Sequence, residues 1–379
     1  MRALEPRGDI RLRIAAIGDI GLIGTARTRA ARDGSDAAFA PLVPALTAAD
    51  QAFANLEFPI GERAWVKPGR SDEFYHDAEI PSALARAGVH VVSLANNHMM
   101  DCGEQGLERT LEVCRAAGLI PIGAGRDLAE ARTPARMTVR GQRVLWLAYG
   151  TTTNDAAAAG RPGIAPLDAA VVAEDCARWR SEADVLVVSA HWGSMYVDYP
   201  PPRVTEVANA ICAAGADVVL GHHPHVLQGI ERRGRAIVLY SLGDAVFNCR
   251  AGDFHAEVAA QKRLESGVFT VLVAAEAPGL EVVPTRLDDD GFPRLLAETE
   301  REAPLARLDG LSEGLADAAN NFAASSAPTL LQYELQSLGT YLRQGRWDRV
   351  AKLLGSVRPR HLPLLWAAVS RRGKRRAAR

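Results

Sequence analysis

Most histidines of this chain follow the end of an apolar run. Nine histidines are present, and five of them lie at such positions. Open α/β sheets bind their ligands at the carboxyl ends of strands, so imidazoles placed there are expected to meet at one edge of a sheet. The five histidines are His98, His191, His222, His223 and His225.

Carboxylate and amide side chains end other apolar runs. Asp19 lies within Gly18-Asp19-Ile20-Gly21 at the end of the first run. Asn55 and Glu57 end the second run and are two residues apart, which puts them on the same side of a strand. Carboxylate, amide and imidazole donors together suit divalent metals such as Mn, Zn or Fe. One or two such ions could activate a hydroxide for attack on an electrophile, so metal-assisted hydrolysis is the expected chemistry.

The individual motifs differ in how specific they are. Asp is a common turn former, so Asp19 taken alone fits a plain turn as well as a ligand. Asn96 and Asn97 tolerate the left-handed conformation and also fit a turn. The segment His223-Pro224-His225 is more specific, because proline fixes the backbone between two imidazoles. The gathering of all these residues at strand ends favours a metal site.

The elements that position these residues are indicated by hydrophobic patterning. Short β-branched runs alternate with longer Ala-rich stretches from about residue 10 to residue 285, which predicts a layered α/β domain. Most of the runs are almost wholly apolar, as in strands buried on both faces. Strands are predicted over 11–17, 51–56, 89–94, 144–148, 185–190, 217–220, 236–240, 267–275 and 280–285. Helices are predicted over 81–87, 106–117, 168–183 and 203–214.

The strand pattern stops after Asp288-Asp289-Asp290-Gly291. A domain over residues 10–290 is therefore expected, followed by a helical C-terminal region over residues 291–379. Near the end of that region, an apolar segment with Trp366 precedes a cluster of basic residues that starts at Arg371. This combination fits peripheral contact with an anionic membrane or a partner. A short packed helix with a solvated basic tail is the favoured interpretation, because charge runs at termini are usually solvated.

Composition limits the function classes. Lys and Arg number 44 and Asp and Glu 45, for a net charge of -1, which argues against a nucleic-acid binder. Five scattered cysteines without a C-x-x-C pair fit a reducing compartment. No signal peptide pattern is recognised, and no run reaches the roughly 18 apolar residues of a membrane span. A cytoplasmic protein is expected.

Six segments together resemble the CapA (PgsA) family of poly-gamma-glutamate capsule synthesis proteins, which share the calcineurin-like metallophosphoesterase fold. The resemblance spans about Arg11 to Phe247 and implies a four-layered α/β/β/α sandwich with a metal site at one edge. The segments are Ile17-Gly18-Asp19, Ala54 to Glu57, Ala95 to His98 with Asp101 and Gly103, His191-Trp192-Gly193, Gly215 to Val226, and Tyr240 to Gly243.

The resemblance also implies roles for individual residues. His98 matches the general acid that protonates the leaving group, with Asp101 to orient it, because an imidazole can give up a proton near neutral pH. Asn55 is expected to help bind a second ion or the substrate, and His222 to support the ligands. Asp244, where the family commonly has Asn, is expected to bring an extra carboxylate near the substrate or the ligands. The metal ligands implied are Asp19, Glu57, Asn97, His191, His223 and His225.

Four residues, at three places in the chain, depart from the family pattern. Metallophosphoesterases usually begin with Asp-x-His, whereas the residue two positions after Asp19 is Gly21. Met195 stands where a Glu is common, and Asp244-Ala245 stands where Asn-Phe is common. The number of metal ions and the substrate pocket therefore stay open.

Two functions from different classes follow. The first is a metal-dependent hydrolase of a phosphoester or a gamma-glutamyl-type amide, acting on an anionic small molecule or polymer in capsule or related polymer metabolism. The alternative is a non-catalytic accessory subunit of a polymer synthase, with a structural metal site. A dinucleotide-binding protein is disfavoured, because no G-x-G-x-x-G follows the first strand.

Overall fold

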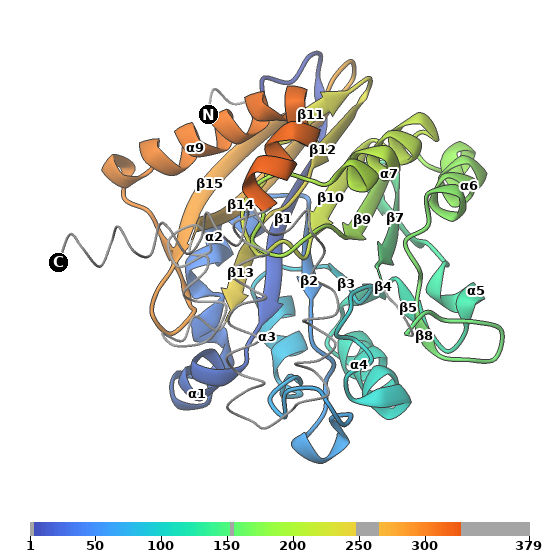
Figure 1. Ribbon diagram of the computed structural model, residues 1–379, viewed down its shortest axis with the longest axis vertical. Helices are drawn as coiled ribbons and strands as arrows, with labels where there is room; N and C mark the ends of the chain where they lie inside the picture. The colour runs from blue at the N-terminus through green and yellow to red at the C-terminus, as the bar shows by residue number, and fades with distance from the viewer. Residues whose placement is uncertain (1–3, 152–154, 248–264, 327–379) are drawn as a thin grey trace, which may run out of the picture.

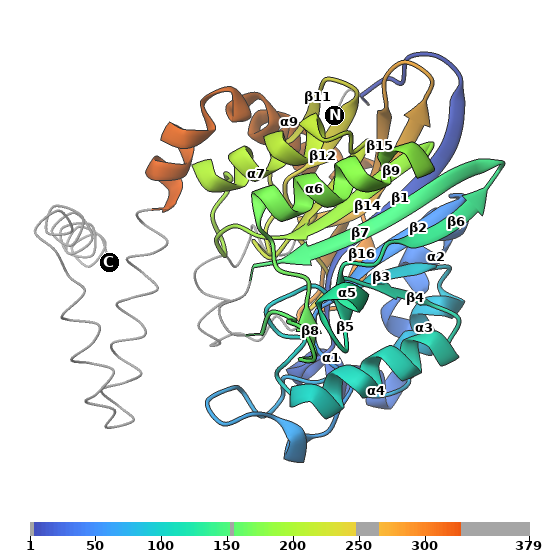
Figure 2. The ribbon, with the colours of Figure 1, turned by 90° about the vertical axis from the view of Figure 1, so that its right-hand side faces the viewer.

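Two β-sheets lie face to face, and helices cover their outer sides (Figures 1 and 2). The computed structural model describes residues 4–151, 155–247 and 265–326. Within these ranges the larger sheet has eight strands in the order β16-β15-β14-β1-β2-β3-β4, with β13 paired to β1. Its strands are β1 (Ile10–Gly21), β2 (Gln51–Leu56), β3 (Val91–Ser93), β4 (Ile120–Ile122), β13 (Asp244–Phe247), β14 (Glu265–Ala274), β15 (Gly279–Leu287) and β16 (Pro293–Leu295).

The smaller sheet has six strands in the described ranges, in the order β11-β12-β10-β9-β7-β6. Its central strands β7, β9 and β10 run parallel, while β6 and β11 pair antiparallel at the two edges. Its strands are β6 (Ala135–Val139), β7 (Gln142–Gly150), β9 (Val185–His191), β10 (Val218–His222), β11 (Ile230–Arg233) and β12 (Ala236–Leu239). A separate two-stranded ribbon joins β5 (Ala124–Gly125) and β8 (Gly163–Ile164).

Helices pack on the outer face of each sheet. The larger sheet is covered by α1 (Gly24–Asp33), α2 (Val43–Thr47), α3 (Ile80–Arg86) and α4 (Gly103–Ala116). The smaller sheet is covered by α5 (Leu128–Ala131), α6 (Ala169–Trp179) and α7 (Pro202–Ala213), and Figure 2 shows α6 and α7 side by side. The short 3₁₀ helices are η1 (Ser35–Ala38), η2 (Ala40–Leu42), η3 (Arg63–Trp65), η4 (Arg180–Glu182), η5 (Glu298–Glu300) and η6 (Gly314–Asp317).

The hydrophobic core forms three layers of packing between these four layers of structure. Alternate residues of β1 contribute to two of these three packing layers. Ala15 and Ile17 face the helices, while Ile14 faces the second sheet. Between the sheets, the rings of Phe53 and Trp146 stack with centroids 5.3 Å apart. The four-layered α/β/β/α sandwich expected from the sequence is confirmed.

The C-terminal part of the described chain is helical and packs on the smaller sheet. Helix α9 (Glu302–Glu313) buries Leu308 and Leu311 in the core between the sheets. The hydroxyl of Ser312 accepts a hydrogen bond from the backbone N–H of Ile230 on β11, at 3.0 Å. Residues 318–326 are again helical. The expected domain boundary at residue 290 stays a prediction, and the basic tail lies outside the described residues.

The predicted strands and helices correspond to observed elements, but several elements escape the sequence patterns. Strand β6 is only half-buried along its length, and β4, β5 and β8 have two or three residues, too few to show a period. Helix α1 buries only Ala26 and Ala30, so it has a weak apolar face. Strand β16 extends the larger sheet beyond Gly291, where the strand pattern was expected to have ended. None of the helices within the described ranges is long and apolar enough to cross a bilayer.

Candidate metal centre

The predicted site residues converge where the carboxyl ends of parallel strands from both sheets meet. Parallel pairing places Asp19 beside Asn55 in the larger sheet and His191 beside His222 in the smaller one. The other site residues follow directly after strands or begin one. Glu57 follows β2, Asn97, His98 and Asp101 follow β3, His223 and His225 follow β10, and Asp244 begins β13.

A glycine allows β13 to reach this edge. A Cβ atom at Gly18 would overlap the carbonyl oxygen of Gly243, so a side chain there would collide with the turn before β13. Next along the chain, the N–H of Asp19 donates to the same Gly243 oxygen at 2.9 Å. Strand β13 then pairs with β1 so that Asp19 and Asp244 are register partners.

Asp19 is held by contacts on both carboxylate oxygens. Its Oδ1 accepts a hydrogen bond from Asn55 Nδ2 at 2.9 Å and lies 3.0 Å from His222 Nδ1. Its Oδ2 accepts a hydrogen bond from the N–H of His223 at 3.0 Å. Burial would raise the pKa of Asp19, but the His222 contact and the neighbouring imidazoles hold that pKa well below its ordinary value. Asn55 and His222 therefore orient an ionised carboxylate.

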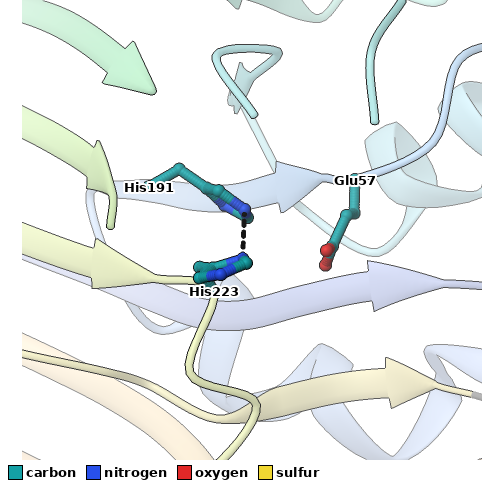
Figure 3. A group of neighbouring side chains, drawn as sticks. All are labelled: Glu57, His191 and His223. Carbon is teal, nitrogen blue, oxygen red and sulfur yellow. Dashed lines mark hydrogen bonds between the residues drawn. The ribbon is translucent and has the colours of Figure 1, made fainter. Parts of the chain in front are cut away.

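A nitrogen-rich group lies on the side of the smaller sheet. His191 Nε2 lies 2.7 Å from Asn97 Oδ1 and 3.1 Å from His223 Nδ1. Figure 3 shows the two tilted rings joined by the contact between these nitrogens, with the Glu57 carboxylate directed toward them. Burial, and then the proximity of His223, lowers the pKa of His191 well below its ordinary value. Burial and the charge of His225 lower the pKa of His223 to about 3. Both imidazoles are thus neutral, which is the form that binds metals.

An acidic group lies beside it. His225 Nε2 is 3.5 Å from Glu57 Oε1, and His225 Nδ1 is 3.6 Å from Asp19 Oδ2. Burial lowers the pKa of His225, but Glu57 and Asp244 outweigh that effect and raise the pKa to about 9. A cation bound by this imidazole would therefore have to displace a proton.

The two groups share one residue. Glu57, His191 and His223 can present ligand atoms within 4.8 Å of one another, and so can Asp19, Glu57 and His225. Glu57 thus lies where one carboxylate could contact two cations.

The donor set fits divalent cations. Asp19, Glu57 and Asp244 are all fully buried at this edge. Burying several carboxylates together costs free energy, which a cation offsets. The mixture of oxygen and nitrogen donors is also the one that Mn, Zn and Fe accept.

The turn between the last two histidines has an uncommon backbone. His223 and His225 adopt positive φ angles of 94° and 55°. Residues other than glycine rarely occupy this region, and strain of this kind gathers at functional sites. The turn directs both imidazoles into the centre.

His98 lies next to the ligand groups and faces them. Its Nδ1 is 2.7 Å from Asp101 Oδ2, and its Nε2 is 4.0 Å from Glu57 Oε1. Asp101 is fully buried and also forms an ion pair with Arg70, whose Nε is 2.8 Å from Asp101 Oδ1. The His98 ring contacts two phenylalanines, Phe58 at 4.8 Å and Phe74 at 4.9 Å between ring centroids. Asp101 and these rings fix the orientation of the imidazole.

Aromatic rings fill the space beside Gly21. A Cβ atom at Gly21 would lie 2.6 Å from Phe247 Cε2 and 2.9 Å from Phe58 Cε2. A side chain at position 21 would therefore require these two rings to move.

All predicted site residues are brought together, and their ligand and catalytic roles stay predictions. Sequence reasoning missed Arg70, because a single arginine in an exposed loop carries no pattern. It also missed the ring of Tyr196, whose centroid is 6.0 Å from that of His225. Phe247 follows Asp244 in the same short strand, but no spacing rule links it to Gly21.

The fold and the site together define a four-layered α/β/β/α protein with a candidate divalent-cation centre at the sheet edge. The chain belongs to the family of bacterial capsule synthesis proteins, PGA_cap, whose model matches residues 13–249.

Similar proteins come from several bacteria. The chain is 31% identical over 255 residues to the capsule biosynthesis protein CapA of Bacillus anthracis, a match that covers 64% of this chain and 61% of that protein. It is 30% identical to the PGA biosynthesis protein CapA of Bacillus subtilis (strain 168), which covers 62% of this chain and 63% of that protein. The chain thus spans somewhat less than two thirds of these relatives.

Solved structures with a similar arrangement are more distant. A hypothetical protein from Thermus thermophilus aligns with a TM-score of 0.45 at 17% identity, covering 72% of this chain and 99% of that chain. A putative 5'-nucleotidase from Staphylococcus aureus aligns with a TM-score of 0.44 at 13% identity, covering 80% of this chain and 58% of that chain.

Proposed function

We propose that this capsule synthesis family protein is a metal-dependent hydrolase that cleaves a phosphoester or a gamma-glutamyl-type amide in an anionic substrate. The observation that carries the proposal is the shared position of Glu57 in two ligand groups, with His98 Nε2 4.0 Å from its carboxylate. This arrangement combines two cation positions with a proton donor, which are the parts that hydrolysis of such bonds requires.

Each cation would have its own group of ligand residues, and Glu57 belongs to both groups. Asp19, Glu57 and His225 would hold one, and Glu57, Asn97, His191 and His223 would hold the other. When bound, the cations supply Lewis-acid polarisation of the scissile group and activation of water. Asn55 and His222 keep Asp19 in place through its Oδ1 atom.

His98 supplies the proton in this proposal. Asp101 Oδ2 accepts from His98 Nδ1, so the remaining nitrogen, Nε2, faces the centre. A proton at Nε2 can pass to the leaving oxygen or nitrogen as its bond breaks. The rings of Phe58 and Phe74 pack against this imidazole.

The substrate class rests on the relatives. Two of them are named as proteins of capsule and PGA biosynthesis. We therefore place the substrate among poly-gamma-glutamate or related anionic polymers, their precursors or their esters.

Metal content and turnover test the proposal together. Purified protein is assayed for bound metal and for hydrolysis of a panel of phosphoesters and gamma-glutamyl amides, before and after chelation. His98→Gln is expected to retain metal and to lose roughly 10²- to 10⁴-fold in turnover. His90→Gln, a change in an exposed histidine away from the centre, serves as the matched control. Absence of bound metal after incubation with excess Mn or Zn, or full activity of His98→Gln, would contradict the proposal.

A second candidate is a non-catalytic accessory subunit of a polymer synthase. It is favoured by a relative in Mycobacterium tuberculosis (strain CDC 1551 / Oshkosh), 34% identical with 64% of this chain and 67% of that protein covered, which is named a probable polyglutamine synthesis accessory protein. In this case a synthase would co-purify with the chain whether or not Asp19 and His225 are replaced. Absence of any co-purifying synthase would argue against this candidate.

A further inference from the structure

Asp244 lies beside the acidic group without belonging to either ligand set. It begins β13, and parallel pairing with β1 makes it the register partner of Asp19. Its side chain is fully buried. Pairing with β1 therefore fixes the backbone position of Asp244 beside Asp19.

The carboxylate contacts one of the candidate ligands directly. His225 Nδ1 lies 2.7 Å from Asp244 Oδ1, compared with 3.6 Å from Asp19 Oδ2. An ionised carboxylate can only accept hydrogen bonds, so Nδ1 carries the hydrogen in this contact. The other ring nitrogen of His225, Nε2, lies 3.5 Å from Glu57 Oε1, and it is the atom left to bind a cation once its proton is displaced.

The other imidazoles of the centre have different neighbours. His191 Nε2 lies against the amide oxygen of Asn97, and His223 Nδ1 lies against His191. Asp244 therefore distinguishes the acidic position from the nitrogen-rich one.

We propose that Asp244 is a positioning residue for the cation held by Asp19, Glu57 and His225. It fixes the tautomer and ring orientation of His225 and makes Nε2 a stronger ligand, as carboxylates bonded to metal-binding histidines do. It also brings a third carboxylate to this position, which favours a hard cation such as Mn²⁺ there. The inference rests on the proposed metal centre and adds a residue that acts on only one of its two positions.

Manganese binding tests this role without reference to turnover. The parent protein and Asp244→Asn are stripped with chelator and titrated with Mn²⁺ by calorimetry and by electron paramagnetic resonance. We expect the parent to bind two equivalents of Mn²⁺. In Asp244→Asn, one equivalent should bind roughly 10- to 100-fold more weakly, and the affinity of the other should be unchanged. Adding Mn²⁺ should therefore raise the Tm of Asp244→Asn less than it raises the Tm of the parent. The Tm of each protein in chelator shows whether the substitution also affects the stability of the fold itself.

Two further variants separate charge from packing. Asp244→Glu keeps the charge and should recover part of the lost affinity, whereas a purely steric role predicts that the larger side chain is worse than Asn. Asp175→Asn is the control, because it removes another buried carboxylate, which is hydrogen-bonded to Arg132 and Tyr149 on the far side of the smaller sheet. This change should lower the Tm in chelator without changing the affinity for Mn²⁺.

The outcomes separate this inference from the proposed function. Two equivalents bound with parental affinity by Asp244→Asn would overturn the role of Asp244 and leave the metal centre standing. Failure of the parent itself to bind Mn²⁺ or Zn²⁺ would overturn both.

Discussion

His191 Nε2 lies 2.7 Å from Asn97 Oδ1, although the two residues come from different sheets of the sandwich. Asn97 follows β3 of the larger sheet, and His191 ends β9 of the smaller one. The candidate centre therefore forms only when the two sheets pack face to face.

Glu57 is the residue on which both cation positions depend. Glu57→Gln removes its charge from both ligand groups, so bound metal should fall from about two equivalents to less than one. Elemental analysis of the dialysed protein measures this. His225→Ala, which touches only the acidic group, should lose no more than one equivalent. If Glu57→Gln retained one full equivalent of metal, the two cation positions would not share Glu57 as a ligand.

Arg70 should influence turnover through Asp101. Its guanidinium pairs with the buried carboxylate that contacts His98, so Arg70→Ala loosens the orientation of the imidazole. We expect turnover to fall about tenfold with metal content unchanged. This loss is smaller than the loss expected from removing the general acid itself. Arg63→Ala, in the same exposed loop and paired with Asp72, is the control. Equal effects of the two changes would indicate a general disturbance of the loop.

Gly21→Ala should destabilise the fold. The added Cβ would overlap the rings of Phe247 and Phe58, and such overpacking costs about 1–3 kcal/mol. Chemical denaturation measures the difference in unfolding free energy. Gly310→Ala places a methyl group in open space on helix α9 and should instead stabilise by about 0.5–1 kcal/mol. If Gly21→Ala left the unfolding free energy unchanged, the rings of Phe247 and Phe58 would move aside easily.

His76 should make the protein sensitive to acid. It is fully buried, accepts a hydrogen bond from the N–H of Leu22 at 3.1 Å, and burial lowers its pKa from 6.5 to about 3. Between pH 6.5 and 3 the unfolded chain binds a proton that the folded protein excludes, so stability falls as pH decreases through this window. The contribution of this histidine approaches about 1.4 kcal/mol per pH unit.

His76→Gln isolates that contribution, because an amide oxygen can accept the Leu22 hydrogen bond without titrating. Unfolding free energies of parent and variant should differ by a constant amount above pH 7, and the variant should gain relative to the parent as pH falls to 4. A pH-independent difference would mean that His76 does not carry the effect.

Much of the centre could be predicted because its residues sit at the ends of strands with clear apolar patterns. Asp19, Glu57 and His191 all lie in or directly after the last residues of such strands, and parallel pairing aligns those ends at one edge. Strongly periodic helices such as α4 and α7 were predicted within a few residues for the same reason.

Other features depend on contacts that no local pattern encodes. The ion pair between Arg70 and Asp101 joins an exposed loop to a buried turn. The closure of the space at Gly21 by Phe247 depends on β13 pairing with β1, across more than half of the chain. Tertiary packing alone determines these two contacts.

The contacts of Asp19 also set the order in which the centre can be completed during synthesis. Its partners His222 and His223 lie 203 and 204 residues further along the chain. A growing chain that ends before His222 holds Asp19, Glu57 and Asn97 together with His191, but neither His223 nor His225. Cation capture by the complete site must therefore wait until β10 and the turn after it have emerged from the ribosome and docked.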